Sequence, residues 1–95
     1  MKIVWSPTAR RRAADAVDYI ARDRPQAALD RYDGLIERIE LLRELPEQGR
    51  VVREWYEESV REILWEPYRV IYEVHDDRVE VLTLSHARQQ LPEAP

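Results

Sequence analysis

Residues 60–74 read VREILWEPYRVIYEV, in which the pair Glu66-Pro67 separates two runs rich in Val, Ile, Leu, Trp and Tyr. β-Branched and aromatic residues favour strands, and so short a connection predicts that the two strands pair antiparallel. In the second run, Tyr68 and Tyr72 fall on one face of a sheet, whereas Arg69 and Ile71 fall on the other. We therefore expect one face to pack on the rest of the protein and the other to be partly wet.

Two further runs of similar composition flank these strands, and short polar turns separate all of them. The four expected strands are Val51–Tyr56, Val60–Trp65, Tyr68–His75 and Val79–Ser85. Strands joined by such short turns predict an antiparallel meander. The tail from His86 to Pro95 is expected to add a short turn of helix.

The first half of the chain is helical apart from one short strand, expected at Lys2–Trp5. Ser6-Pro7 then combines an N-cap residue with a proline at the first helical position. Apolar residues at helical spacing predict one helix that ends before Pro25 and a second over about residues 26–45. The short break between them predicts an antiparallel hairpin. We interpret Gly34 in the second helix as allowing a close approach to the alanine-rich first helix.

These elements predict an α+β fold of two layers. An N-terminal strand and an antiparallel helical hairpin are expected to pack on a C-terminal antiparallel β-sheet. A length of 95 residues predicts a single domain over residues 1–95.

Composition excludes several classes of protein. Apolar residues make up 44% of the chain and charged residues 36%, which is too hydrophobic for a disordered chain and too charged for a membrane protein. The chain contains no cysteine, which excludes disulfides, thiolate catalysis and Cys-ligated metal. Together with the lack of an apolar signal segment near Met1, this favours a cytoplasmic protein. We expect no metal site, no cofactor and no membrane association.

The charge balance is unusual, because the net charge is −4 although 14 of the 15 basic residues are Arg. Nucleic-acid-binding domains usually carry excess positive charge, so we expect no direct sequence-specific binding to nucleic acid. Arginine presents a planar fork of donors that suits carboxylates, phosphates and interfaces. A GC-rich coding sequence is the simplest explanation for most of these arginines.

Several motifs resemble those of the RelE/ParE toxins of bacterial type II toxin–antitoxin systems. Residues 46–50 (PEQGR) resemble the P-x-x-G-R stretch of that family, and residues 60–63 and 67–74 resemble its VRE…YR core. Residues 79–88 resemble its last strand, which ends in H-x-R, and residues 24–28 (RPQAA) resemble a helix start in which the family has Asn in place of Arg24. The resemblance implies a small cytoplasmic toxin that a cognate antitoxin neutralises in a hetero-oligomer.

Two activities occur on that fold, so the fold alone does not decide between them. RelE-like members cleave mRNA on the ribosome, and ParE-like members inhibit DNA gyrase without a known catalytic step. If this chain is a ribonuclease, the resemblance makes Arg61, Arg69 and Arg88 phosphate donors and His86 a proton-transfer group. Alternation along the strands could bring these four residues together at one end of the exposed sheet face.

Some positions depart from the RelE-like pattern. Ile63 stands where that pattern has a second basic residue, the sequence after Arg88 differs, and the net charge is negative. We therefore favour a ParE-like toxin that inhibits DNA gyrase by protein–protein binding and is not an enzyme. The alternative is a RelE-like ribosome-dependent mRNA endoribonuclease. A third reading is a family member that has lost toxicity and persists as a binding module.

Trp, Tyr and Arg are enriched at the hot spots of protein interfaces, so we select candidate binding residues mainly from these residue types. The residues expected to contact the target or the antitoxin are Trp55, Arg61, Trp65, Arg69, His86, Arg88, Arg10 and Arg11, with Tyr56 beside Trp55. We expect the C-terminal region of the antitoxin to wrap the chain and cover part of this surface.

Several of these residues also have a purely structural reading. Arg69 can pair with Glu62 or Glu73, and Trp65 can pack the sheet onto the helices. His86 can act as a satisfied or capping histidine, and the arginines at the start of the first helix can form a solvated face.

Overall fold

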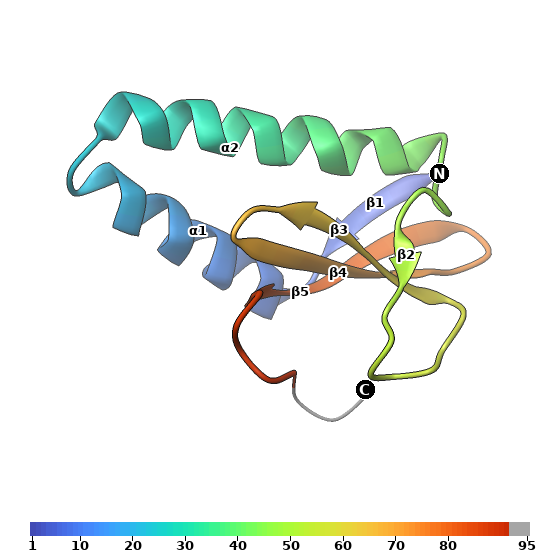
Figure 1. Ribbon diagram of the computed structural model, residues 1–95. Helices are drawn as coiled ribbons and strands as arrows, with labels where there is room; N and C mark the ends of the chain where they lie inside the picture. Colours follow the sequence, from blue (N-terminus) through green and yellow to red (C-terminus); the bar gives the residue numbers. More distant parts are fainter. Residues whose placement is uncertain (92–95) are drawn as a thin grey trace.

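The computed structural model describes residues 1–91, which form two helices on one face of a five-stranded sheet (Figure 1). The elements are β1 (Lys2–Trp5), α1 (Pro7–Ala21), α2 (Pro25–Glu40), the 3₁₀ turn η1 (Leu41–Arg43), β2 (Arg50–Val51), β3 (Val60–Trp65), β4 (Tyr68–Val74) and β5 (Arg78–His86). The predicted two-layer α+β fold is confirmed. Within the described residues, no helix combines the length and apolar character that crossing a membrane requires.

Ser6 begins α1 as the sequence predicts. Its hydroxyl oxygen accepts a hydrogen bond from the backbone N–H of Ala9 at 3.0 Å, and Pro7 follows at the first helical position. The same hydroxyl donates to the carbonyl of Leu82 at 2.6 Å. Ser6 therefore caps the helix and also ties its N-terminus to β5.

The second helix is shorter than the apolar pattern predicts. It begins at Pro25 and ends at Glu40, and a tighter turn over Leu41–Arg43 takes the place of its last residues. Leu42 is fully buried in this turn with Tyr72 and Val79. The apolar stripe continues past Glu40 because Leu42 still packs on the sheet, so the pattern predicts burial correctly and the helix end wrongly.

The main core lies between the helices and the sheet. Small residues of α1 and larger residues of α2 pack against Trp65 and Val70, with Trp5 at the rim. The buried members of this cluster are Ala9, Ala13, Ala16, Leu35, Ile39, Trp65, Val70, Val81 and Leu84. The structural interpretation of Trp65, that it packs the sheet onto the helices, is confirmed.

The strand order is β1-β5-β4-β3-β2 among the described residues, and β3, β4 and β5 form the predicted antiparallel meander. The first strand pairs in parallel with β5, so the sheet is mixed. This pairing was not predicted, because nothing local in Lys2–Trp5 specifies its partner. A register shift at Ile71/Tyr72 lets Val81 and Leu84, which are three residues apart, both join the core on the helix side.

The predicted strand over Val51–Tyr56 is wrong beyond its first residue, because β2 spans Arg50–Val51 alone. The chain then turns, and the backbone N–H of Trp55 donates to the carbonyl of Val52 at 3.2 Å. Val52 and Trp55 pack instead with Ile71 in a second cluster on the face away from the helices. This face is therefore partly covered by a loop, where the sequence predicted a partly wet surface.

The tail expected to form a short turn of helix lies partly outside the described residues, which end at residue 91. Within them, the backbone N–H of Gln89 donates to the carbonyl of His86 at 2.9 Å, which closes a turn and not a helix.

The two glycines have opposite surroundings. A Cβ on Gly49 would meet the carbonyl oxygen of Glu62 and would lie 2.6 Å from the Tyr72 hydroxyl. A Cβ on Gly34 would meet no atom within 4 Å, so the interpretation that this glycine allows close helix packing is wrong. Gly49 is required by the space around it, and Gly34 is not.

Substituting each glycine by alanine should therefore change stability in opposite directions. We expect Gly49→Ala to lower the free energy of unfolding by about 3 kcal/mol, because backbone atoms must move apart. Gly34→Ala should raise it by about 1 kcal/mol through helix propensity. Urea unfolding of both variants checks this, and two changes of the same sign would contradict the packing described.

Candidate functional site

A buried carboxylate links three strands on the face away from the helices. The Glu62 side chain on β3 is 1% exposed, and Arg50 of β2 and Arg69 of β4 both bind it. Arg50 Nε donates to Glu62 Oε1 at 2.8 Å, and Arg69 Nε donates to Glu62 Oε2 at 3.0 Å. Arg69 also pairs with Glu54 through two hydrogen bonds of 2.7 and 3.0 Å. One arginine therefore holds two carboxylates.

The ion pair between Arg69 and Glu54 is charged at neutral pH. The hydrogen bonds from Arg69 lower the pKa of Glu54 from 4.5 to about 2. The hydrogen bonds from Glu54 and Glu62 raise the pKa of Arg69 further above its already high value. Arg69 and Glu54 are therefore ion-pair partners of each other and poor candidates for proton transfer.

Arg61 lies on the opposite, helix-facing side of the sheet and supports the loop between η1 and β2. Its Nη1 donates to the carbonyls of Gly49 at 2.9 Å and Glu47 at 3.3 Å. On the same side, the hydroxyl of Tyr72 donates to the carbonyl of Pro46 at 2.8 Å and accepts from the N–H of Gly49 at 2.9 Å. Burial raises the pKa of Tyr72. These contacts explain the P-x-x-G-R motif as a loop that side chains of the sheet hold in place.

His86 ends β5 beside a pocket of about 540 Å³ that lies between the helices and the β3–β4 turn. Its ring meets Tyr68 edge-on at 5.6 Å, and its Nδ1 accepts from the backbone N–H of Arg88 at 3.1 Å. The side chain of Arg88 is exposed. The structural reading, a histidine that caps the turn after β5, is what these contacts show.

The expected convergence of Arg61, Arg69, His86 and Arg88 on one sheet face is not found. Arg61 lies on the helix-facing side of the sheet, directly opposite Tyr72 in the β3–β4 pairing. Arg69 lies on the other face, which it shares with Ile71. Each of the two is engaged by partners within the chain. The four residues therefore do not surround a common point as one catalytic group.

The remaining predicted residues differ in how accessible they are. Trp65 is 1% exposed, donates from Nε1 to the carbonyl of Arg31 at 3.0 Å and has the Arg31 guanidinium 4.5 Å from its ring centroid. Trp55 is half-buried at the rim of the second cluster. Arg10 and Arg11 are exposed on α1.

Arg12, the third arginine of that run, binds β5. Its Nη1 donates to the hydroxyl of Thr83 at 3.0 Å and to the carbonyl of Leu84 at 3.1 Å. Of the three consecutive arginines, Arg10 and Arg11 are therefore solvated, and Arg12 fastens α1 to the sheet.

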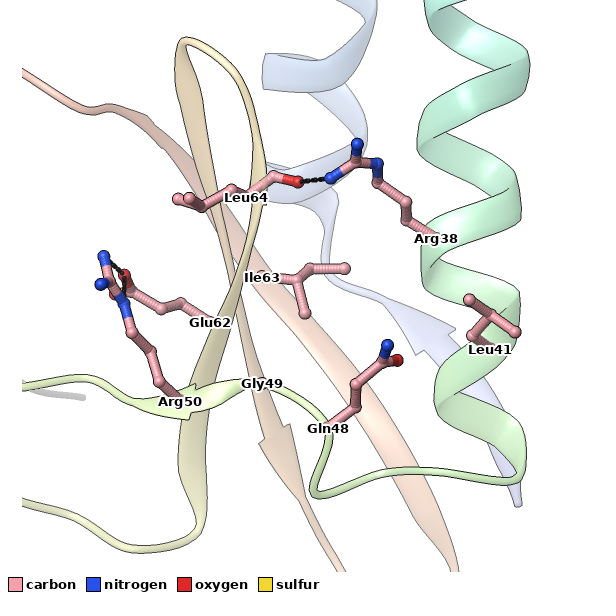
Figure 2. A pocket seen from close by; sticks show the side chains of 8 residues that line it. All are labelled: Arg38, Leu41, Gln48, Gly49, Arg50, Glu62, Ile63 and Leu64. Atoms are coloured by element: carbon pink, nitrogen blue, oxygen red, sulfur yellow. Dashed lines mark hydrogen bonds and ion pairs between the residues drawn. The ribbon is translucent and has the colours of Figure 1, made fainter.

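The outer edge of β3 carries a feature that sequence reasoning missed. The carbonyl of Val60 accepts from Val52 at 3.1 Å, so alternation turns the backbone groups of Leu64 to the same outer side. Within the described chain, β2 pairs with β3 no further than Glu62, so Leu64 lies beyond the paired part. Figure 2 shows Arg38 reaching from α2 to the Leu64 carbonyl.

A pocket lies on each side of this edge. The pocket towards α2 has a volume of about 350 Å³ and the pocket on the other face about 510 Å³, and both are lined by Arg50, Glu62 and Leu64. Leu41 and Arg38 line the first (Figure 2), and Arg53 lines the second. We call these two pockets and the outer edge between them the β3 edge groove. The local sequence carries no signal for this groove, because the exposure of Leu64 follows from the point at which β2 begins to pair with β3.

Comparison with known proteins agrees with this fold. The family described as "ParE toxin of type II toxin-antitoxin system, parDE" matches residues 3–91. The chain belongs to this ParE toxin family. It is 35% identical over 94 residues to a Sinorhizobium fredii protein named "Putative toxin Y4kP", with 97% of this chain and 94% of that protein covered. Membership of a toxin–antitoxin family implies an antitoxin partner.

A solved structure also shares the fold. The structure titled "Chromosomal ParDE TA system from P. aeruginosa" superposes with a TM-score of 0.74 at 20% identity, and the match covers 90% of this chain and 95% of that one. This likeness shows the shared fold, and the family match over residues 3–91 confirms the ParE-like resemblance of the sequence motifs.

The Glu62 network predicts a large loss of stability when Arg69 is removed. Arg69→Gln leaves a buried carboxylate with Arg50 as its remaining ion-pair partner, so we expect the free energy of unfolding to fall by about 3–5 kcal/mol. Arg53→Gln is the matched control, because Arg53 lines the same pocket and is exposed. It should change stability by less than about 0.5 kcal/mol. Equal effects in chemical denaturation would contradict the role given to Arg69.

Proposed function

We propose that this chain is a toxin that inhibits DNA gyrase by binding it, and that a cognate antitoxin neutralises it by covering its surface. The observation that carries the proposal is the family match over residues 3–91. Toxins of the ParE family generally act on gyrase without a catalytic step. The same action is the simplest inference for a member that retains the whole fold.

The arrangement of the arginines supports a binding protein over a ribonuclease. Metal-free RNA cleavage needs a base, an acid and cations grouped around one phosphate. Arg61 holds the carbonyls of Glu47 and Gly49 on one face, and Arg69 holds two carboxylates on the other. The net charge of −4 also disfavours docking into ribosomal RNA, because affinity for nucleic acid depends on neutralising phosphates.

The loop over residues 52–59 is the part of the surface best suited to a protein target. Tyr56 is 88% exposed and has a φ of 53°, a left-handed conformation that is uncommon for a residue other than glycine. Such strain persists where the surrounding structure imposes it, and it is concentrated at functional sites. Trp55 packs beneath and Arg53 is exposed beside it, so the loop presents the residue types of an interface hot spot.

Removing the Tyr56 ring should therefore weaken inhibition of gyrase. Tyr56→Asn removes the ring and tolerates the left-handed backbone. We expect at least about a tenfold rise in the toxin concentration that halves supercoiling by purified gyrase, as for the loss of one hot spot. Tyr19→Asn is the matched control, because Tyr19 is also exposed but lies on α1.

One result would contradict gyrase as the target, and another would contradict the role of the loop alone. If the toxin left supercoiling by purified gyrase unchanged and instead cleaved translated mRNA at defined codon positions, the RelE-like ribonuclease would be favoured. Equal losses for the Tyr56 and Tyr19 variants would leave gyrase as the target and remove the loop from the interface.

For the antitoxin, the β3 edge groove is the surface that best fits an extended segment. The exposed part of β3 offers backbone groups for an added strand, as in β-augmentation. Leu41 and Leu64 are half-exposed in it, and Arg38 and Arg50 flank them. A segment that alternates apolar and acidic residues matches this pattern. A backbone N–H of this segment would donate a hydrogen bond to the Leu64 carbonyl in place of Arg38. The guanidinium of Arg38 would then be available to pair with a carboxylate of the antitoxin. The exposed Arg10 and Arg11 form a second binding surface for acidic residues of the antitoxin.

Leu64→Pro tests the added strand. Proline removes the outward N–H of Leu64 and leaves the hydrogen bonds to β4 untouched. We expect it to weaken binding of the antitoxin's C-terminal region by at least about tenfold more than Leu64→Ala does, in calorimetric titration. Far-ultraviolet circular dichroism checks that both variants fold. The idea fails if both variants bind equally, or if the DNA-binding N-terminal part of the antitoxin alone protects the toxin from proteolysis.

A further inference from the structure

Three side chains with metal-ligating atoms meet on the face of the sheet away from the helices, near the β4–β5 turn. Glu73 lies on β4, His75 directly follows that strand, and Glu80 lies on β5. The Nε2 atom of His75 is 3.1 Å from Glu80 Oε1 and 3.6 Å from Glu73 Oε1. One ligand atom from each residue lies within 4.8 Å of the others. None of the three belongs to the Glu62 network or to the β3 edge groove.

The register of the sheet forces the two carboxylates together. Glu73 and Glu80 are directly opposite each other in the β4–β5 pairing. Like charges at directly opposite positions destabilise a sheet. Within residues 1–91, both carboxylates contact the imidazole ring of His75, while Arg78 pairs with Asp77 at 3.0 Å. A cation between the two carboxylates would remove this repulsion.

The donor set and its spacing suit zinc. One imidazole nitrogen with two carboxylate oxygens is a mixture that zinc accepts, whereas magnesium and calcium prefer oxygen alone. Two ligands bound about 2.1 Å from a tetrahedral ion lie about 3.4 Å apart. The observed separations of 3.1 and 3.6 Å lie on either side of this value. The three side chains are 26–31% exposed, so water can supply the fourth ligand.

We propose that Glu73, His75 and Glu80 form a zinc-binding site that fastens β4 to β5. No metal site was expected from the sequence, and the register of β4 against β5 places Glu80 beside Glu73 and His75. Binding to the folded chain alone would raise its stability by mass action. The site is independent of the gyrase interaction proposed above.

Calorimetric titration of the full, chelator-treated chain with zinc chloride tests the site, with thermal unfolding as a second measurement. We expect one zinc ion per chain and a rise in melting temperature. His75→Gln should weaken binding at least tenfold. His86→Gln is the matched control, since the chain has 2 histidines, and should bind zinc as the unmodified chain does.

The Glu80→Gln variant separates the loss of zinc binding from any loss of folding. It removes a ligand and also the repulsion from Glu73, so the metal-free variant should be at least as stable as the unmodified chain while losing the zinc-dependent rise in melting temperature. Equal zinc binding by the unmodified chain and His75→Gln would overturn the proposal. So would equal responses to zinc and magnesium chloride, which would indicate an unspecific acidic surface.

Discussion

The carboxylate of Glu62 is almost completely removed from water, and such a charge is tolerated in a protein interior only when it is paired. Arg50 and Arg69 supply that pairing from the strands on either side. This requirement explains why β2 exists although it spans just Arg50–Val51: its pairing with β3 brings Arg50 over Glu62. The position of the loop before β2 is then restricted, because its last residue, Gly49, must fit between the Glu62 backbone and the Tyr72 side chain.

The short β2 has a consequence for binding. A longer second strand would pair with the rest of β3 and close the edge of the sheet. Because β2 begins only at Arg50, opposite Glu62, Leu64 remains beside two pockets, and a side chain from α2 satisfies its carbonyl. A side chain that fulfils a backbone role can be displaced by another backbone, so the free toxin keeps a protected but available edge. The same ion pairs that stabilise the sheet thus fix the position of β2 and leave this part of the β3 edge unpaired by another strand among the described residues.

Local patterns predicted the parts of the fold that local physics determines. Ser6 capped α1 as expected, and period-two alternation predicted β3 and β4 within one residue. Alternation failed at residues 52–56, because Val52 and Trp55 are apolar for a different reason: they cover Ile71 from a loop. The parallel pairing of β1 with β5 depends on long-range packing, which no window of sequence contains.

Register limited the prediction of the candidate site in the same way. Arg69 was correctly considered as a partner of Glu62, since the two residues can be placed on one face by counting. The relation of Arg61 to Gly49 could not be found by counting, because it depends on where the loop after η1 returns. Glu80 likewise becomes a neighbour of His75 through the pairing of β4 with β5. Residue types were therefore predicted better than their groupings.

The large share of arginine has a structural use that composition alone does not suggest. Arginine offers several donors in a rigid plane, so one side chain can satisfy backbone carbonyls that strand edges, turns and helix ends leave unpaired. Among residues 1–91, five arginines donate to backbone carbonyls: Arg12, Arg31, Arg38, Arg43 and Arg61. Lysine, a point charge on a flexible stem, would hold such sites less firmly. Much of the positive charge is thus engaged within the molecule, and in a chain of net charge −4 this leaves a surface better matched to a protein target than to a phosphate backbone.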